Sequence, residues 1–134
     1  MSLTVAPDLL DQARAGDIDQ SAFLDTIRTS LPYAYELIAS LTASLPGSGD
    51  EFADNQVPPA TEAERGQLLR ALASDAIRGG LEQHFGVTLA FQNCHRVAVF
   101  RAPAGIDVTG TRRYQEFISP RSQVLNQSPQ LRNC

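Results

Sequence analysis

The residues best able to do chemistry stand in one short run, FQNCHR, at positions 91–96. It sets a thiol, Cys94, next to an imidazole, His95, which raises the question of a Cys–His nucleophile. Adjacent side chains of a strand point to opposite faces, so these two would face apart. The other histidine, His84, would reach the thiol only if the chain doubled back. The pattern therefore argues against a catalytic cysteine.

Metal binding and disulfide formation are the other uses of these residues. Structural zinc takes four Cys or His ligands in close pairs. The chain has two cysteines and two histidines, His84, Cys94, His95 and Cys134, without such a pair, so no metal is predicted. A Cys94–Cys134 disulfide is open, but a reduced compartment and the scattered spacing argue against it. The acidic segment 46–60 lacks the ligand spacing of a calcium loop.

Two interpretations of the run remain, a hairpin turn and a small binding site. Asn tolerates left-handed backbone, Cys is often a small buried residue, and His95 and Arg96 would begin the return strand. The turn is the favoured interpretation. The second is a polar site at the helix–strand junction for a ligand or a partner carboxylate, covered by the loop 46–60. Its candidate residues are His84, Gln92, Asn93, Cys94, His95 and Arg96.

The elements that must position these residues follow from periodicity and capping signals. Residues 1–45 predict helices, with Pro7 at a first position, Gly16 as a stop, Asp19 as an N-cap and a break near Ser30 before Pro32. Residues 46–60 predict a loop. The T-x-x-E pattern at Thr61 and Glu64 opens a helix over 61–85 that ends at Gly86. Residues 87–101 predict a strand pair, and 102–134 a tail of uncertain order. The sum is a single α+β domain with N-terminal helices packed on a small antiparallel sheet.

Charge is divided unevenly along the 134 residues. Residues 1–60 hold nine acids and two Arg, a net charge of −7, whereas residues 61–134 hold nine Arg and six acids, a net charge of +3. Such a division predicts a homodimer, or a protein partner or small anionic ligand for the second half. The absence of Lys and of interleaved basic and aromatic residues argues against nucleic acid. Because the chain has no Lys, mechanisms that need a lysine nucleophile or Schiff base are excluded. No cofactor is predicted.

Location follows from the N-terminus and from the apolar runs. The start, MSLTVAPDLLDQARAGD, has neither a basic region nor an apolar region, so no signal peptide is predicted. Apolar runs are only a few residues long, so no membrane span is predicted. These features indicate a cytoplasmic protein.

One resemblance extends over most of the chain. The stretches SLPYAYELIASL, FADNQVPPATEAERGQLLRALASDAIRGG and HFGVTLAFQNCHRVAVFR resemble a family of small single-domain actinobacterial proteins of uncharacterised function, over residues 3 to about 102. The resemblance implies a cytoplasmic single-domain protein and no particular chemistry. The predicted function is therefore a small binding or partner protein without catalysis of its own. The alternative is a small pocket enzyme, of lyase, cyclase or hydrolase type, using His84, Cys94, His95 and Arg96.

Overall fold

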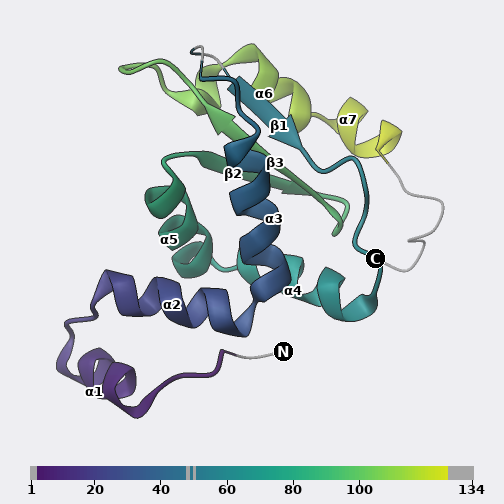
Figure 1. Cartoon of the computed structure of the whole chain (residues 1–134). Helices are drawn as coiled ribbons and strands as arrows, with labels where there is room; N and C mark the ends of the chain where they lie inside the picture. The colour runs from purple at the N-terminus through teal and green to yellow at the C-terminus, as the bar shows by residue number, and fades with distance from the viewer. Residues whose placement is uncertain (1–2, 48, 50, 127–134) are drawn as a thin grey trace.

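Two groups of helices enclose a small antiparallel sheet (Figure 1). The computed structural model describes residues 3–47, 49 and 51–126. The strands are β1 (Glu51–Asp54), β2 (Thr88–Gln92) and β3 (Arg96–Arg101). The helices are α1 (Pro7–Ala15), α2 (Gln20–Ser30), α3 (Pro32–Ala43), α4 (Glu62–Leu72), α5 (Asp75–Phe85), α6 (Arg112–Phe117) and α7 (Pro120–Leu125), with the short 3-10 turn η1 (Val108–Gly110). The predicted α+β class is confirmed.

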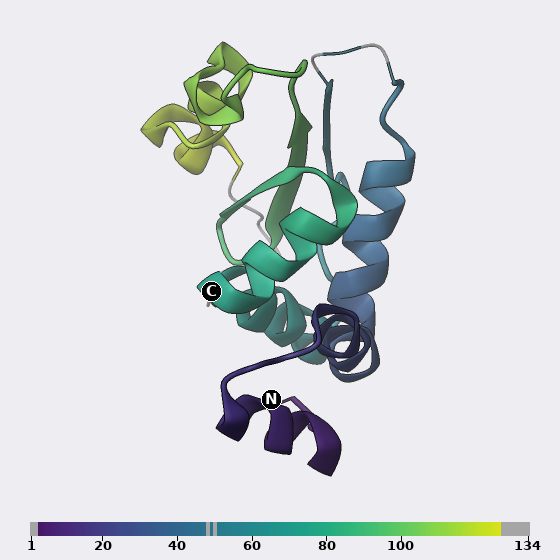
Figure 2. The same cartoon turned by 90° about the vertical axis from the view of Figure 1, so that its left-hand side faces the viewer.

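The sheet has the order β1-β3-β2, so β3 is central. Both neighbours run antiparallel to it, with Glu51 opposite Arg101 and Leu89 opposite Val99. Because side chains alternate along a strand, the sheet presents two different faces. Each face is covered by its own set of helices (Figure 2).

The main core lies between one face of the sheet and helices α2 to α5. Leu89, Val97 and Val99 point into it from the strands and meet aliphatic side chains such as Ile38 and Leu68. A smaller cluster lies on the opposite face. It consists of Ala90, Ala98, Phe100 and Phe117. Phe117 belongs to α6, so the segment expected as a tail supplies part of the core.

Local signals explain where several helices begin and end. The Asp19 side chain accepts from the amide of Ser21, and the Thr61 hydroxyl accepts from the amide of Glu64 at 3.1 Å. These bonds satisfy amides that have no partner within the helix. Gly16 and Gly86 end α1 and α5 with φ angles of 81° and 67°, which glycine adopts without a steric penalty. The predicted caps and stops are confirmed.

The structure differs from the expected elements in three places. The segment 46–60, expected as a loop, contains β1, whose Glu51 is buried and ion-paired with Arg101. The stretch 61–85, expected as one helix, is divided into α4 and α5 because Ser74 caps a new helix, its hydroxyl accepting from the amide of Ile77. The segment after residue 101 forms η1, α6 and α7.

Two further observations concern packing and the membrane. Gly79 and Gly80 are consecutive residues of α5, where the absence of a side chain lets another element come close. At Gly80 that element is α2 of the same chain, since a Cβ there would lie 3.4 Å from the ring of Phe23, whereas Gly79 has open space. Within the described part of the chain, no helix has the length and apolar character to cross a membrane.

Candidate functional site

The run at positions 91–96 forms the tip of the β2–β3 hairpin. Gln92 pairs with Arg96, and the three residues between them make the turn. Asn93 and Cys94 have φ angles of 55° and 53°, the left-handed region that primed hairpin turns use. The predicted turn is therefore confirmed.

The side chains of this turn bond to the protein itself. The buried amide of Gln92 donates to the carbonyl oxygen of Phe117, and that of Asn93 donates to the carbonyl oxygen of Gln123 at 3.0 Å. His95 is only 6% exposed, and its Nδ1 lies against the carbonyl oxygen of Asn93. The bonds of Gln92 and Asn93 dock the hairpin on α6 and α7, so these two amides already have acceptors within the protein.

Arg96 is engaged by an acid of β1. Its Nε lies 3.1 Å from Oδ2 of Asp54, its Nη2 contacts the same oxygen, and its Nη1 donates to the side-chain oxygen of Asn126 at 2.8 Å. The side chain of Asp54 is 7% exposed and that of Arg96 is 22% exposed. The guanidinium therefore joins β1, β3 and the end of α7.

Cys94 is disulfide-bonded, and no cysteine in the described part of the chain is free. The expectation of a reduced Cys94 is wrong, because cysteine number and spacing do not determine which sulfurs approach in space. The other cysteine of the sequence, Cys134, lies outside the described residues. A disulfide sulfur offers no thiolate for nucleophilic attack.

His84 lies apart from the other five predicted residues. It stands in the last turn of α5, whereas the hairpin tip lies beyond the far end of β2. At about 3.4 Å per residue, a strand of this length spans about 17 Å. The four residues of the pocket-enzyme alternative do not meet in one pocket. Among the described residues, no group of three His, Cys, Asp or Glu could hold a metal ion.

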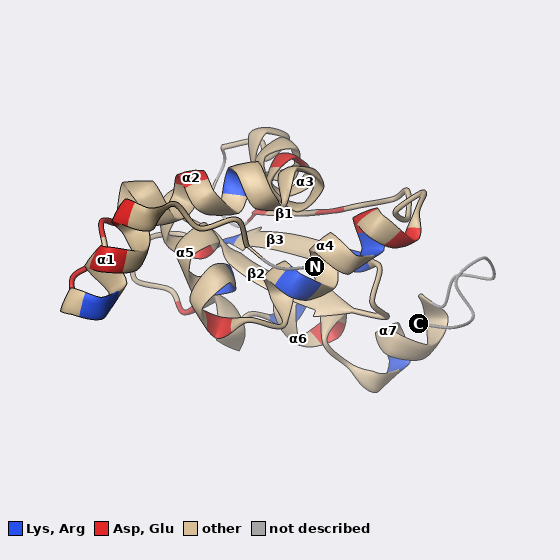
Figure 3. Ribbon diagram, turned by 90° about the horizontal axis from the view of Figure 1, so that it is seen from below, with Lys and Arg blue, Asp and Glu red and all other residues tan. Residues whose placement is uncertain are grey.

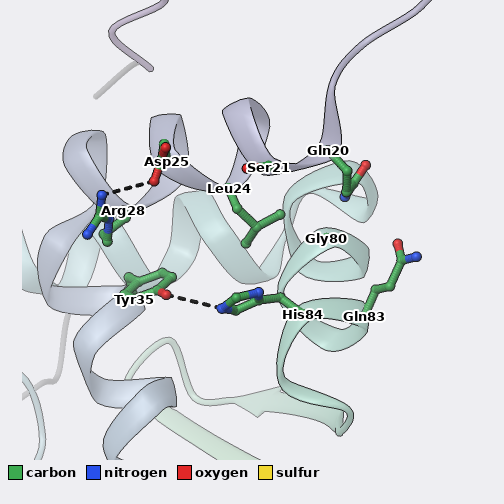
Figure 4. A pocket seen from close by; sticks show the side chains of 9 residues that line it. All are labelled: Gln20, Ser21, Leu24, Asp25, Arg28, Tyr35, Gly80, Gln83 and His84. Atoms are coloured by element: carbon green, nitrogen blue, oxygen red, sulfur yellow. Dashed lines mark hydrogen bonds and ion pairs between the residues drawn. The ribbon is translucent and has the colours of Figure 1, made fainter.

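A pocket of about 420 Å³ lies where α2, α3 and α5 meet, and His84 is in its wall (Figure 4). Most of its lining residues have polar side chains, but more than half of the lining surface is apolar, because carbon atoms of these side chains add to those of Leu24 and Gly80. The lining residues are Gln20, Ser21, Leu24, Asp25, Arg28, Tyr35, Gly80, Gln83 and His84. Its volume falls in the range of about 300–1,000 Å³ typical of ligand sites.

Tyr35 and His84 point toward each other across this pocket from α3 and α5 (Figure 4). The Tyr35 hydroxyl and the His84 Nε2 are 3.3 Å apart. Phe85 contacts both rings, with centroid distances of 4.7 Å to His84 and 5.4 Å to Tyr35. The pair is thus oriented by its neighbour, and one partner of the bond must donate while the other accepts.

An acid and a base stand together at the rim. Arg28 Nη2 lies 2.9 Å from Oδ1 of Asp25, one helical turn away on α2. The two side chains are 54% and 66% exposed, so the pair is loosely held and either charge can turn to a ligand. An imidazole, a phenol, a guanidinium and a carboxylate therefore all line this pocket.

Sequence analysis named His84 and missed the rest of this pocket. A partial signal existed, because Ser21, Leu24, Asp25 and Arg28 follow the three-and-four spacing of one helical face, as do Gly80, Gln83 and His84. The sequence therefore indicates that each set of residues shares a helical face. It does not indicate that α3 and α5 come together at this pocket, since Tyr35 and His84 are 49 positions apart.

No curated protein and no solved structure matches the chain. One family does match it, over residues 1–134, and its description names an open reading frame and states no activity. The chain belongs to the uncharacterised family described as NucS shadow ORF.

Proposed function

We propose that this protein binds a small polar ligand in the pocket between α2, α3 and α5, and acts as a binding or partner protein without catalysis of its own. The observation that carries the proposal is the Tyr35–His84 pair, which faces an open pocket of about 420 Å³ instead of being buried in the core. A cytoplasmic location and an actinobacterial source belong to the proposal. They rest on the sequence pattern and the family resemblance.

The lining favours a ligand rich in hydrogen-bond acceptors. Arg28 and the amides of Gln20 and Gln83 can donate, as can the hydroxyl of Tyr35. Asp25 is the one carboxylate among the described lining residues. A small carboxylate or phosphate matches this surplus of donors, and a guanidinium binds either with two parallel bonds.

The test is a titration of the protein with small carboxylates and phosphates, followed by NMR and calorimetry. Tyr35→Phe removes one hydrogen-bonding group from the pocket and should weaken binding by up to about tenfold. His84→Ala should weaken it further, because it also removes the ring that orients Tyr35.

A matched control stands two residues away on the same helix. Tyr33 does not line the pocket, and its pKa is raised by burial and by the charge of Glu64, so its phenol stays protonated. Tyr33→Phe should leave binding unchanged. Binding that survives both Tyr35→Phe and His84→Ala would place the ligand elsewhere and refute the site.

A pocket enzyme is the second candidate, favoured by the hydrogen bond between an imidazole and a phenol at an open site. Of the four residues first considered, only His84 lines this pocket, so it would serve as acid or base with Tyr35 as its partner. The measurement is product formation from a bound ligand, followed by NMR over hours. Turnover that His84→Gln abolishes would favour the enzyme.

A further inference from the structure

One end of the molecule carries acids that form no ion pair with any described residue. Asp8 and Asp11 lie on α1, and Asp17 and Asp19 on the link to α2; all four are exposed. None of them is in an ion pair with another described residue. Arg14 is the one base in this stretch. We call α1 and its link to α2, residues 7–19, the acidic end.

The opposite end carries exposed arginines that likewise form no ion pair with any described residue. Arg112 and Arg113 lie on α6, and Arg121 lies on α7; all three are exposed. None is ion-paired with another described residue, although Arg113 lies 5.6 Å from the ring centre of Phe52. Glu116 is the one acid on these two helices. We call α6 and α7, residues 112–125, the basic end.

Both ends also expose large apolar side chains. Leu10 and Ile18 at the acidic end are each 44% exposed. At the basic end Ile118 is 48% exposed, Val124 is 68% exposed and Leu125 is 63% exposed. Exposed ion pairs contribute little alone, so an interface needs apolar contacts of this kind as well.

The two ends cannot meet within one chain. Figures 1 and 2 show the acidic end below α2 and the basic end on the opposite face of the sheet. The red segments of α1 and the blue segment of α7 are widely separated in Figure 3. Among the described residues, the charges of one end are therefore not paired with those of the other.

We propose that the partner is a second copy of this chain, with the acidic end of each copy docked on the basic end of the other. Two copies related by a two-fold axis form this contact twice, so every charged end is matched and the assembly closes. The charge complementarity lies within the chain itself, which is the reason for choosing a second copy as the occupant. Opposite charges across such a contact raise the rate of association and set the orientation.

Salt dependence in sedimentation of the full chain gives the first test. At micromolar concentration and low ionic strength the chain should sediment as a dimer. Because exposed charges are screened at high ionic strength, 0.5 M salt should raise the dissociation constant roughly tenfold or more. A chain that stays monomeric in low salt refutes the proposal.

Charge reversal gives the sharper test. Asp8→Arg with Asp11→Arg produces a chain with two basic ends, and Arg112→Glu with Arg121→Glu produces a chain with two acidic ends. Each variant alone should remain monomeric, while an equal mixture should recover dimers that contain one copy of each, because both contacts are then complementary. A mixture that stays monomeric, although both variants fold by circular dichroism, overturns the proposal.

The control reverses an exposed charge away from both ends. Glu36 lies on α3, is exposed and has no ion pair with another described residue. Glu36→Arg should leave the dissociation constant within about twofold of that of the parent chain. An effect as large as that of the Asp8 and Asp11 reversal would show that net charge, not the acidic end, controls association, and would also overturn the proposal.

Discussion

At the level of single residues, the ion pairs of the sheet and the ion pair of the pocket differ in how deeply they are buried. Glu51 and Asp54 on β1 are almost fully buried, and each meets an arginine of β3, Arg101 and Arg96 respectively. Asp25 and Arg28 form a pair of similar length that is more than half exposed. Losing the arginine of a buried pair would leave a carboxylate without a partner in the interior, which is costly.

This contrast predicts unequal effects of two matched substitutions. Arg96→Gln leaves the buried carboxylate of Asp54 without its cation and should lower the free energy of unfolding by about 2 kcal/mol. Arg28→Gln breaks a solvated pair and should change it by less than about 0.5 kcal/mol. Urea unfolding measures both changes in the free energy of unfolding, provided that the dependence on urea concentration has the same slope in the parent chain and in the variants. Equal midpoints for the two variants would show that the Asp54–Arg96 pair does not stabilise the fold.

The sequence revealed the types of these residues but not their partners. FQNCHR was readable as a turn, since Asn and the flanking strand patterns are local signals. That Arg96 meets Asp54, 42 positions earlier, depends on the pairing of β1 with β3. β1 itself was missed because its four residues lie among prolines and acids, so the pairing decides its structure more than its local sequence does.

At the level of elements, the helix ends show which signals are local. Thr61 caps α4 through a residue three positions ahead, which a pattern can reveal. The cap of α3 comes from another helix: Oε1 of Gln67 on α4 accepts from the amides of Tyr33 at 2.7 Å and Ala34 at 3.2 Å. No pattern around Pro32 indicates this bond, because its two ends are more than thirty positions apart.

The cap from Gln67 predicts a stability cost that depends on the acceptor oxygen. Gln67→Ala should lower the free energy of unfolding by about 1–2 kcal/mol, because it leaves two amides at the start of α3 without an acceptor. Gln67→Glu keeps the acceptor and adds a negative charge near a helix N-terminus, so it should retain most of the stability. Thermal unfolding followed by circular dichroism compares them. A loss as large with Glu as with Ala would mean that packing, not capping, is the role of Gln67.

At the level of the whole molecule, residues 102–126 complete the fold, although the segment 102–134 was expected as a tail of uncertain order. Its polar composition concealed this role, since a few apolar residues suffice to cover a three-stranded sheet. The ring of Phe117 is 6% exposed and lies 5.8 Å from that of Phe100 and 6.2 Å from that of Phe52. Removing this segment would expose one face of the sheet. For that reason, association is better tested with charge variants of the full chain than with a chain that ends at Arg101.

The same packing gives the last prediction. Phe117→Ala removes the aromatic ring that covers the second face and should lower the free energy of unfolding by about 3 kcal/mol. Ile118→Ala is the neighbouring control. Because Ile118 is 48% exposed, this substitution should lower the free energy of unfolding by less than about 1 kcal/mol.

A chain ending at Arg101 loses the whole layer, so it should bind a hydrophobic dye and aggregate at concentrations where the full chain does not. If Phe117→Ala unfolds at the same urea concentration as the parent chain, α6 does not pack on the sheet as described. A soluble, cooperatively folded chain ending at Arg101 would lead to the same conclusion.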